Sequence, residues 1–274
     1  MKRFHTFKSV VTMLVATVCA GLILVSCGAV PLTGRKQILL VSDQEVYQAG
    51  LTQYKEYIAS SELSKDTKTT AMVKSVGKKL ADATEKYLRA NGFESEIANL
   101  QWEFNLVKNN EVNAFCMPGG KIVVYEGLFA VAQNEAELAV VLGHEIAHAV
   151  AKHSNERMSQ QILAQYGAAI LQQALSQKSA AVQTVAVNVF GLGAQVGMML
   201  PYSRKHEYEA DYMGIVFMEI AGYDSQSAVD FWSKMSAGGG NASDFFSTHP
   251  SDSKRIAQIT ARMPEAKKVA ENCR

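Results

Sequence analysis

Three residues in one short segment have the types and the spacing of a zinc-dependent hydrolytic site. His144 and His148 are four positions apart, and Glu145 directly follows the first histidine. Because residues four apart share one face of a helix, both imidazoles can reach a single metal ion. Glu145 then flanks the water that zinc activates, which is the place of a general base in a His-Glu-x-x-His site. The sequence therefore predicts one zinc ion per chain, with two histidine ligands and a glutamate base.

The segment around this motif is apolar. From Leu138 to Val150 the other residues are Ala, Val, Leu, Ile and Gly, so we expect a buried helix. A buried carboxylate costs free energy unless it is paired or takes part in a reaction. The alternative, two core histidines beside a stray glutamate, leaves the charge of Glu145 unexplained.

A catalytic zinc ion needs a third protein ligand and one open position. The best source is the segment that ends at Asp211, because Glu207 and Asp211 are four apart on one helix face. Glu207 can bind the metal while Asp211 accepts the free ring N–H of a zinc-bound histidine. His206 is a rival ligand, but it is displaced from Glu207 by about 100° around the helix.

Two further histidines can serve such a site in more than one way. His249 precedes Pro250 in a loop that follows three glycines. It can stabilise the oxyanion of a tetrahedral intermediate, occupy the open zinc position as a gate, or cap the next helix. His153 comes five residues after His148 and falls off the ligand face, so we expect it to be structural or to support a ligand.

The rest of the pattern predicts an α+β fold that is predominantly helical, with a small sheet before the motif helix. Ser42 and Glu45 form a capping box, and Asn134 is expected to cap the motif helix. The uncharged stretch 181–200 is long enough to suggest a membrane span, but its glycines and amides favour a buried or groove-lining helix. Helices are expected over residues 42–59, 67–90, 134–150, 155–177, 181–200, 205–221, 225–237 and 250–263, and strands over 102–107, 111–117 and 121–125.

The first 26 residues have the features of a secretory signal. Three basic residues precede an uncharged apolar run from Val10 to Val25, and Cys27 follows as in a bacterial lipobox. We expect cleavage before Cys27, lipidation of that cysteine and an outer-membrane location facing the periplasm, with the inner membrane as the alternative. A permanent membrane span is the other interpretation, although the run is short against the roughly 20 residues that a span needs.

Composition narrows the function classes. The chain has 48% hydrophobic residues, enough for a large core, and a net charge of +1. Without residues 1–26 it keeps 24 Lys+Arg against 26 Asp+Glu, a net charge of −2. Neither value gives an electrostatic reason to bind nucleic acid. Cys116 and Cys273 remain beyond the signal and the lipid site, and an exported compartment permits a disulfide between them without requiring one.

Several motifs in this order resemble the M48 metallopeptidases, and the lipoprotein members most closely. They are the His-Glu-x-x-His motif, the segment 203–214, and Thr248-His249-Pro250 followed by Arg255-Ile256. Asn113-Ala114-Phe115 with Pro118-Gly119-Gly120 also resembles the strand before the motif helix of that family. The resemblance covers residues 101–263. It implies a gluzincin-type fold, with Glu207 as the third zinc ligand and Asp211 as the partner of His144.

Local chemistry and this resemblance together predict a zinc endopeptidase. Glu145 would activate water against peptide bonds, and the backbone of Asn113, Ala114 and Phe115 would bind an extended substrate as an added strand. The expected substrates are misfolded exported envelope proteins, which implies a role in protein quality control. The expected segments are a signal peptide (1–26), an anchored segment with a helix (27–66), the metallopeptidase domain (67–263) and a tail (264–274).

Two other function classes stay open. A chaperone-like or scaffolding envelope lipoprotein would use the same groove without essential proteolysis, and a structural metal protein would bind zinc but no substrate. A structural zinc site normally has a fourth protein ligand, so the glutamate of the motif favours the enzyme. The expected partners are polypeptide substrates, a membrane contacted through the lipid anchor, and envelope-assembly proteins or a second copy of the chain.

Overall fold

The computed structural model describes residues 27–174, 200–237, 245, 249 and 254–273. In this part the chain is predominantly helical, with a three-stranded and a two-stranded sheet, which confirms the predicted fold class. No helix within these residues is long and apolar enough to cross a membrane. The predicted helix at 181–200 lies, up to residue 199, outside the described residues.

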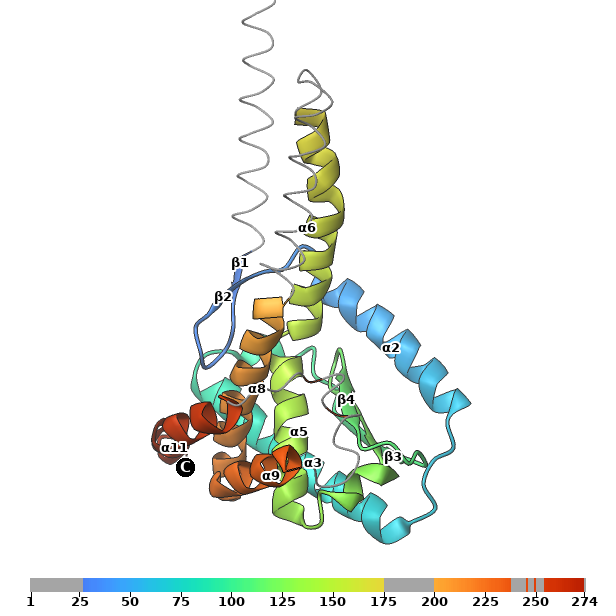
Figure 1. Ribbon diagram of the computed structural model, residues 1–274, viewed down its shortest axis with the longest axis vertical. Helices are drawn as coiled ribbons and strands as arrows, with labels where there is room; N and C mark the ends of the chain where they lie inside the picture. The colour runs from blue at the N-terminus through green and yellow to red at the C-terminus, as the bar shows by residue number, and fades with distance from the viewer. Residues whose placement is uncertain (1–26, 175–199, 238–244, 246–248, 250–253, 274) are drawn as a thin grey trace, which may run out of the picture.

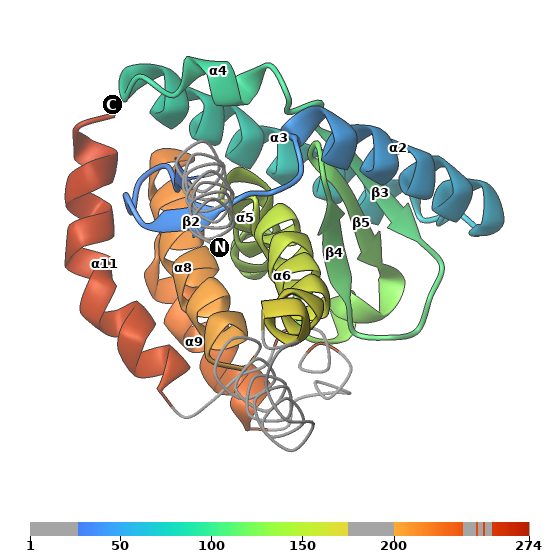
Figure 2. The same ribbon diagram turned by 90° about the horizontal axis from the view of Figure 1, so that it is seen from above.

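Two helices form the centre of the molecule and carry the motif segments. α5 (Glu135–Val150) and α8 (Leu200–Ile220) lie side by side, and α3 (Thr67–Ala90) packs against both (Figures 1 and 2). α9 (Gln226–Ser236) and α11 (Arg255–Glu271) lie on the side away from the larger sheet. Apolar side chains from all five helices belong to one hydrophobic cluster.

Two glycines set the spacing between α5 and α8. A β-carbon on Gly143 would stand 3.1 Å from the carbonyl oxygen of Gly214, and one on Gly214 would stand 3.1 Å from the backbone nitrogen of His144. Backbone atoms cannot rotate away, so a side chain at either position would force the helices apart. This close approach fixes the distance between the histidines of α5 and the carboxylates of α8.

The larger sheet has the strand order β3-β5-β4. β3 (Glu103–Val107) is parallel to β5 (Lys121–Tyr125), and β4 (Ala114–Met117) is antiparallel to it at the edge next to α5. Alternate residues face opposite sides, so Ile122 enters the main core whereas Val123 packs with Tyr54 of α2 (Asp43–Ser60). Two short turns of helix, α4 (Glu94–Ile97) and η1 (Glu126–Ala130), precede β3 and α5.

Helix starts follow the signals in the sequence. Ser42 and Glu45 make both bonds of the capping box at α2. The Asn134 side chain accepts a hydrogen bond from the Glu137 N–H at the start of α5. These caps satisfy backbone groups within one turn, which is why the sequence alone predicts them.

The last helix differs from the prediction. The sequence predicts a helix over 250–263, but α11 runs from Arg255 to Glu271 with Pro264 inside it. A proline removes one N–H and normally ends a helix. Here Pro264 and Thr260, whose carbonyl loses its partner, are exposed, whereas Ala266 and Ala270 are buried. Burial of the last turns, with water available to the freed carbonyl, outweighs the missing hydrogen bond.

An extended segment, residues 27–41 and here called the N-terminal strap, packs against α6 (His153–Ala174) (Figure 2). Within it β1 (Cys27–Ala29) pairs antiparallel with β2 (Lys36–Ile38). Val30 is fully buried in the main hydrophobic cluster. The Leu40 N–H donates to the Ser159 hydroxyl at 2.8 Å. The strap therefore belongs to the same packed unit as the motif helices.

Candidate metal centre

Four side chains meet where α5 and α8 approach each other. His144 and His148 of α5, Glu207 of α8 and His249 each offer one ligand atom, and these atoms lie within 4.8 Å of one another. His144 Nε2 is 3.1 Å from Glu207 Oε2, and His148 Nε2 is 3.4 Å from Glu207 Oε1. Two imidazole nitrogens and a carboxylate oxygen are a ligand set of hydrolytic zinc sites. The donor chemistry therefore fits a single zinc ion.

His249 lies inside this cluster. Its Nδ1 atom is 3.2 Å from Glu207 Oε2 and 3.2 Å from His144 Nε2. Its Nε2 atom is 3.3 Å from Glu145 Oε1, and its ring stacks on Phe245 at 4.5 Å between centroids. Both ring nitrogens of His249 therefore face groups of the cluster.

His144 is held from behind by a buried ion pair. Its Nδ1 atom is 2.9 Å from Asp211 Oδ1, and Asp211 accepts hydrogen bonds from Arg255 Nε and Nη2, both at 2.7 Å. The guanidinium of Arg255 lies 3.5 Å from the ring centroid of Trp232. A carboxylate at Nδ1 keeps the proton there and leaves Nε2 of His144 available to a metal.

His148 is supported through a second histidine. Its Nδ1 atom is 2.8 Å from Nδ1 of His153, whose Nε2 is 3.0 Å from Glu209 Oε2. Lys152 between α5 and α6 has φ +55°, a left-handed conformation that ends α5 and turns His153 back towards the site. The ammonium of Lys152 is paired with Asp43 and Glu96 at 2.6 and 2.7 Å, which helps to hold this turn.

His206, the rival ligand, lies away from the metal cluster. Its Nε2 atom is 3.0 Å from Glu156 Oε2, and its ring stacks on His153 at 4.3 Å between centroids. Helical geometry explains the difference, since neighbouring residues on α8 point about 100° apart. The structure thus brings Glu207, and not His206, to the histidines of α5.

Glu145 is a buried carboxylate with an unused oxygen. It is 2% exposed, and the backbone N–H of Cys116 in β4 hydrogen-bonds to its carboxylate. Its Oε1 atom makes no hydrogen bond with the described residues, and the nearest charge partner of that atom is Nε2 of His249 at 3.3 Å. Burial raises the pKa of Glu145, although His249 and His144 oppose that effect. An unsatisfied buried acceptor is costly, and a general base is a role that requires one.

Charges around the cluster suit a divalent cation. Burial lowers the pKa of His144, but Asp211 and Glu207 raise it to about 9. Burial raises the pKa of Glu207, whereas His148 and His144 lower it well below its ordinary value. Asp211 follows the same pattern, with Arg255 and His144 lowering its pKa against burial. The carboxylates of Glu207 and Asp211 are therefore both ionised at neutral pH.

The predicted substrate-binding segment presents its residues in two directions. The Tyr125 N–H donates to the Asn113 carbonyl at 3.1 Å. Hydrogen-bonded pairs alternate along an antiparallel ladder, so the backbone groups of Ala114 and Cys116 point away from β5, towards the free edge. The Ala114 N–H donates to the Asn113 side chain at 2.9 Å. Phe115 packs on the outer face of the sheet against two tyrosines, away from the metal cluster.

The cysteines form no disulfide within the described residues. Cys116 in β4 and Cys273 after α11 are both free thiols, so the bond that the sequence permits is not made. Cys27 begins β1. Its lipidation stays a prediction.

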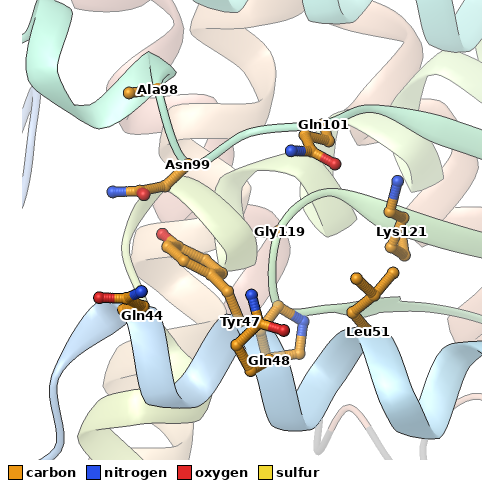
Figure 3. Close-up of a pocket in the computed structure, with 10 residues that line it drawn as sticks. Gln44, Tyr47, Gln48, Leu51, Ala98, Asn99, Gln101, Gly119 and Lys121 are labelled. Atoms are coloured by element: carbon orange, nitrogen blue, oxygen red, sulfur yellow. The ribbon is translucent and has the colours of Figure 1, made fainter.

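A cavity of about 310 Å³ lies beside the sheet, between α2 and the turn that joins β4 to β5 (Figure 3). Tyr47 of α2 and the amide side chains of Asn99 and Gln101 line it. A smaller cavity of about 20 Å³ shares Tyr47 and Pro118 with it and reaches His148. The smaller cavity thus reaches the metal cluster at His148, on the side where β4 ends.

Sequence reasoning did not single out Arg35, Glu156 or the function of Glu209. Arg35 donates to Glu209 Oε2 at 2.8 Å and to both carboxylate oxygens of Glu156 at 2.9 and 2.7 Å. No local spacing connects position 35 with positions 156 and 209. Only the tertiary structure brings these residues behind the metal cluster.

The chain is similar to several curated peptidases. It is 36% identical over 191 residues to the mitochondrial metalloendopeptidase OMA1 of Schizosaccharomyces pombe, a match to 65% of this chain and 52% of the relative. It is 39% identical over 172 residues to the protein of that name from Arabidopsis thaliana, covering 62% and 33%. It is 26% identical over 269 residues to the beta-barrel assembly-enhancing protease of Escherichia coli, covering 93% and 52%. The chain spans about half the length, or less, of these relatives.

These relatives contradict the predicted outer-membrane location. Two of the three are named as mitochondrial, and so are similar peptidases from Saccharomyces cerevisiae and Homo sapiens. The prediction used a basic start, an apolar run and a cysteine placed as in a bacterial lipobox. Those features indicate a targeting segment in general, and they do not identify the membrane to which it leads.

The family match agrees with the geometry of the centre. The model of peptidase family M48 matches residues 67–263, a range that includes the two histidines of α5, Glu207 and His249. Members of this family use zinc, and the donor set described above offers a place for one ion. The chain therefore belongs to peptidase family M48 and contains the zinc metallopeptidase domain of that family.

Proposed function

We propose that this chain is a zinc endopeptidase that cleaves extended segments of unfolded polypeptides. The observation that carries the proposal is Glu145, a buried carboxylate whose Oε1 atom faces only the His249 imidazole, beside a donor set of two histidines and one carboxylate. Residues 67–263 would be the catalytic domain. Because the predicted compartment is contradicted, the proposed substrate class is defined by its unfolded state alone.

His144, His148 and Glu207 would hold the zinc ion. Bound zinc polarises a peptide carbonyl and lowers the pKa of water. Glu145 accepts the proton of the attacking water on its unbonded oxygen and passes it to the leaving amine, so that the carboxylate is regenerated when the peptide bond breaks. Asp211 keeps the ring of His144 in the tautomer that has Nε2 free.

His249 has contacts that support a gating role. Its distances of 3.2 Å to Glu207 and 3.3 Å to Glu145 place it across the face of the cluster that a substrate carbonyl must reach. We propose that the side chain occupies this position in the resting protein and moves when a substrate enters. After it moves, it can donate a hydrogen bond to the oxyanion of the tetrahedral intermediate.

The free edge of β4 supports recognition of an extended chain. Backbone groups of Ala114 and Cys116 point to that edge, and the Cys116 N–H reaches the carboxylate of Glu145. A peptide that adds as a strand at this edge would lie next to the base. A folded substrate cannot offer such a strand, so selectivity for unfolded polypeptides follows. Asn113 would order the edge through its bond to the Ala114 N–H.

The test compares Glu145→Gln with the wild-type chain on unfolded casein. We expect cleavage to fall by a factor of about 10² to 10⁴, the usual contribution of a general base, while zinc content measured by elemental analysis stays at one ion per chain. Glu135→Gln, an exposed change on the same helix, is the matched control and should cleave normally. Undiminished cleavage by Glu145→Gln would overturn the proposal. A Glu145→Gln chain that retains the full biological effect of the wild type would favour the chaperone-like alternative.

A further inference from the structure

We propose that Arg35 and Thr33 of the N-terminal strap are positioning residues for His148, acting through Glu209 and His153. The proposal rests on His148 being a zinc ligand, as set out under the proposed function. It assigns a role in metal binding to a segment that lies outside residues 67–263, the range matched by the family. The strap would then be part of the metal centre, although none of its residues touches the ion.

The first step is the contact between two histidines. His148 offers Nε2 to the cluster, where it is 3.4 Å from Glu207, so its proton must be on Nδ1. That N–H donates to Nδ1 of His153 at 2.8 Å. Nδ1 of His153 is then the acceptor, and the proton of this ring is on Nε2. The second N–H in turn needs an acceptor, because His153 is 1% exposed and has no access to water.

Glu209 is that acceptor. Its Oε2 atom is 3.0 Å from Nε2 of His153. The series therefore runs in one direction, from the ligand His148 through His153 to a carboxylate. Each N–H donates towards the negative charge, which makes His148 a better electron donor and keeps its ring in one orientation.

The strap fixes Glu209. Arg35 Nε donates to Oε2 at 2.8 Å, and the Thr33 hydroxyl donates to Oε1. Both oxygens are thus engaged, and the Glu209 side chain is only 6% exposed. Without the strap the carboxylate would be free to turn away from His153. Local sequence on α8 cannot supply this restraint, since the residues before and after Glu209 point to other sides of the helix.

The guanidinium of Arg35 also binds a second carboxylate, which provides an internal control. Its Nη1 and Nη2 atoms donate to the two oxygens of Glu156 at 2.9 and 2.7 Å. Glu156 Oε2 is 3.0 Å from His206 Nε2, and among the described residues Glu156 makes no hydrogen bond to His153 or His148. Glu209 and Glu156 therefore have the same arginine partner and similar burial, 8% and 2% exposed, but only Glu209 continues to the metal ligand.

The experiment measures the zinc affinity of the full chain by competition with a chromophoric chelator. We expect Glu209→Gln to bind zinc about tenfold more weakly than the wild type, because loss of an outer partner of a ligand histidine typically costs 10-fold to 100-fold. Glu156→Gln should stay within about twofold of the wild type by the same reasoning. His153→Phe, which keeps an aromatic ring but removes both nitrogens, should lose at least as much affinity as Glu209→Gln.

A purely structural role for the strap predicts different results. Thermal unfolding of the metal-free proteins checks the fold, and we expect Glu156→Gln and Glu209→Gln to lower Tm by similar amounts. Equal losses of zinc affinity in the two variants, or no loss in Glu209→Gln, would overturn the proposal. Arg35→Lys keeps one charge and should retain more affinity than Arg35→Met, which has none; equal affinities of these two variants would also contradict it.

This measurement is independent of proteolysis. A wild-type chain that binds zinc but cleaves no casein would refute the proposed function and leave the positioning role intact. A chain that cleaves casein while Glu209→Gln binds zinc normally would do the reverse. The two proposals can therefore fail separately.

Discussion

The two histidines of the motif lie one turn apart on α5, yet they are supported in different ways. His144 contacts a carboxylate directly, and that carboxylate, Asp211, is held by Arg255. His148 reaches its carboxylate through another histidine, and Glu209 is held by the N-terminal strap. Both arrangements meet the same requirement. When one ring nitrogen faces a metal, the N–H of the other nitrogen needs an acceptor.

Two ligands on one helix can therefore be supported by residues from separate parts of the chain. Support for His144 comes from α8 and α11, which pack closely on one another within the main core. Support for His148 comes from the start of α6 and from a strap more than a hundred residues earlier in sequence. We expect the direct arrangement to matter more for stability and the relayed one more for metal affinity alone.

The largest effect is expected from Arg255→Met, which breaks the direct arrangement. Arg255 is 1% exposed, and removing it takes two charge-assisted hydrogen bonds from the buried carboxylate of Asp211, which keeps only His144 as an ion-pair partner. Such a change costs about 3 to 5 kcal/mol of unfolding free energy, and zinc affinity should fall as well. Arg262→Met is the matched control, because Arg262 also lies over an aromatic ring of the same region, Tyr212, but is 42% exposed. Urea unfolding that shows equal losses for both variants would contradict the comparison.

The second-largest effect is an acid-dependent loss of stability at Glu156, the carboxylate that Arg35 of the strap also binds. Burial raises the pKa of Glu156, but hydrogen bonds from His206 and Arg35 lower it to about 2 from 4.5. A depressed pKa stabilises the fold above pH 4.5, and that stabilisation is lost as the pH falls from 4.5 to 2. At pH 6 metal-free Glu156→Gln should be less stable than the metal-free wild type by up to about 3 kcal/mol. The gap should narrow towards pH 2, and a gap that stays constant would rule out this assignment.

A smaller effect that acts on both histidines is expected from Gly214→Ala. The new β-carbon would meet the backbone of Gly143 and His144 at 3.1 Å, so α5 and α8 must move apart by tenths of an ångström. Overpacking of this kind costs about 1 to 3 kcal/mol. Gly143→Ala would meet the backbone of Gly214 on α8, with its carbonyl oxygen at 3.1 Å, and should behave alike in urea unfolding. A neutral result for either variant would show that the close approach does not limit the site.

The smallest effect, on zinc affinity, is expected from Thr33→Val. This variant removes one of the two hydrogen-bond donors from the strap to Glu209. The shape of the residue is kept and Arg35 still binds the carboxylate, so zinc affinity should fall by only about twofold to fivefold, which corresponds to a hydrogen bond worth roughly 0.5 to 1 kcal/mol. Chelator competition is the measurement. A loss as large as that of Glu209→Gln would mean that Thr33, and not Arg35, holds Glu209.

Local features of this protein could be predicted because they depend on residues within one or two turns. The helix caps and the long helix α3 are of this kind. So are the four-residue spacings that direct His144 with His148, and Glu207 with Asp211, to common faces. α11 shows the limit of local reasoning. Pro264 is a strong local signal for a helix end, but burial of Ala266 and Ala270 overrides it.

The metal-binding motif and the type of metal could be predicted from the sequence, because the spacing of ligands along a helix depends on the helix alone. The sequence also favoured Glu207 over His206, because neighbouring residues on a helix point about 100° apart, but the packing of α8 on α5 decided that Glu207 faces the histidines. Which residues support the ring of His148 on the side away from the metal depends on the tertiary structure alone. Arg35, Glu156 and Glu209 are far apart in the chain and have no common period, so their meeting depends on how the strap packs across α6 and α8.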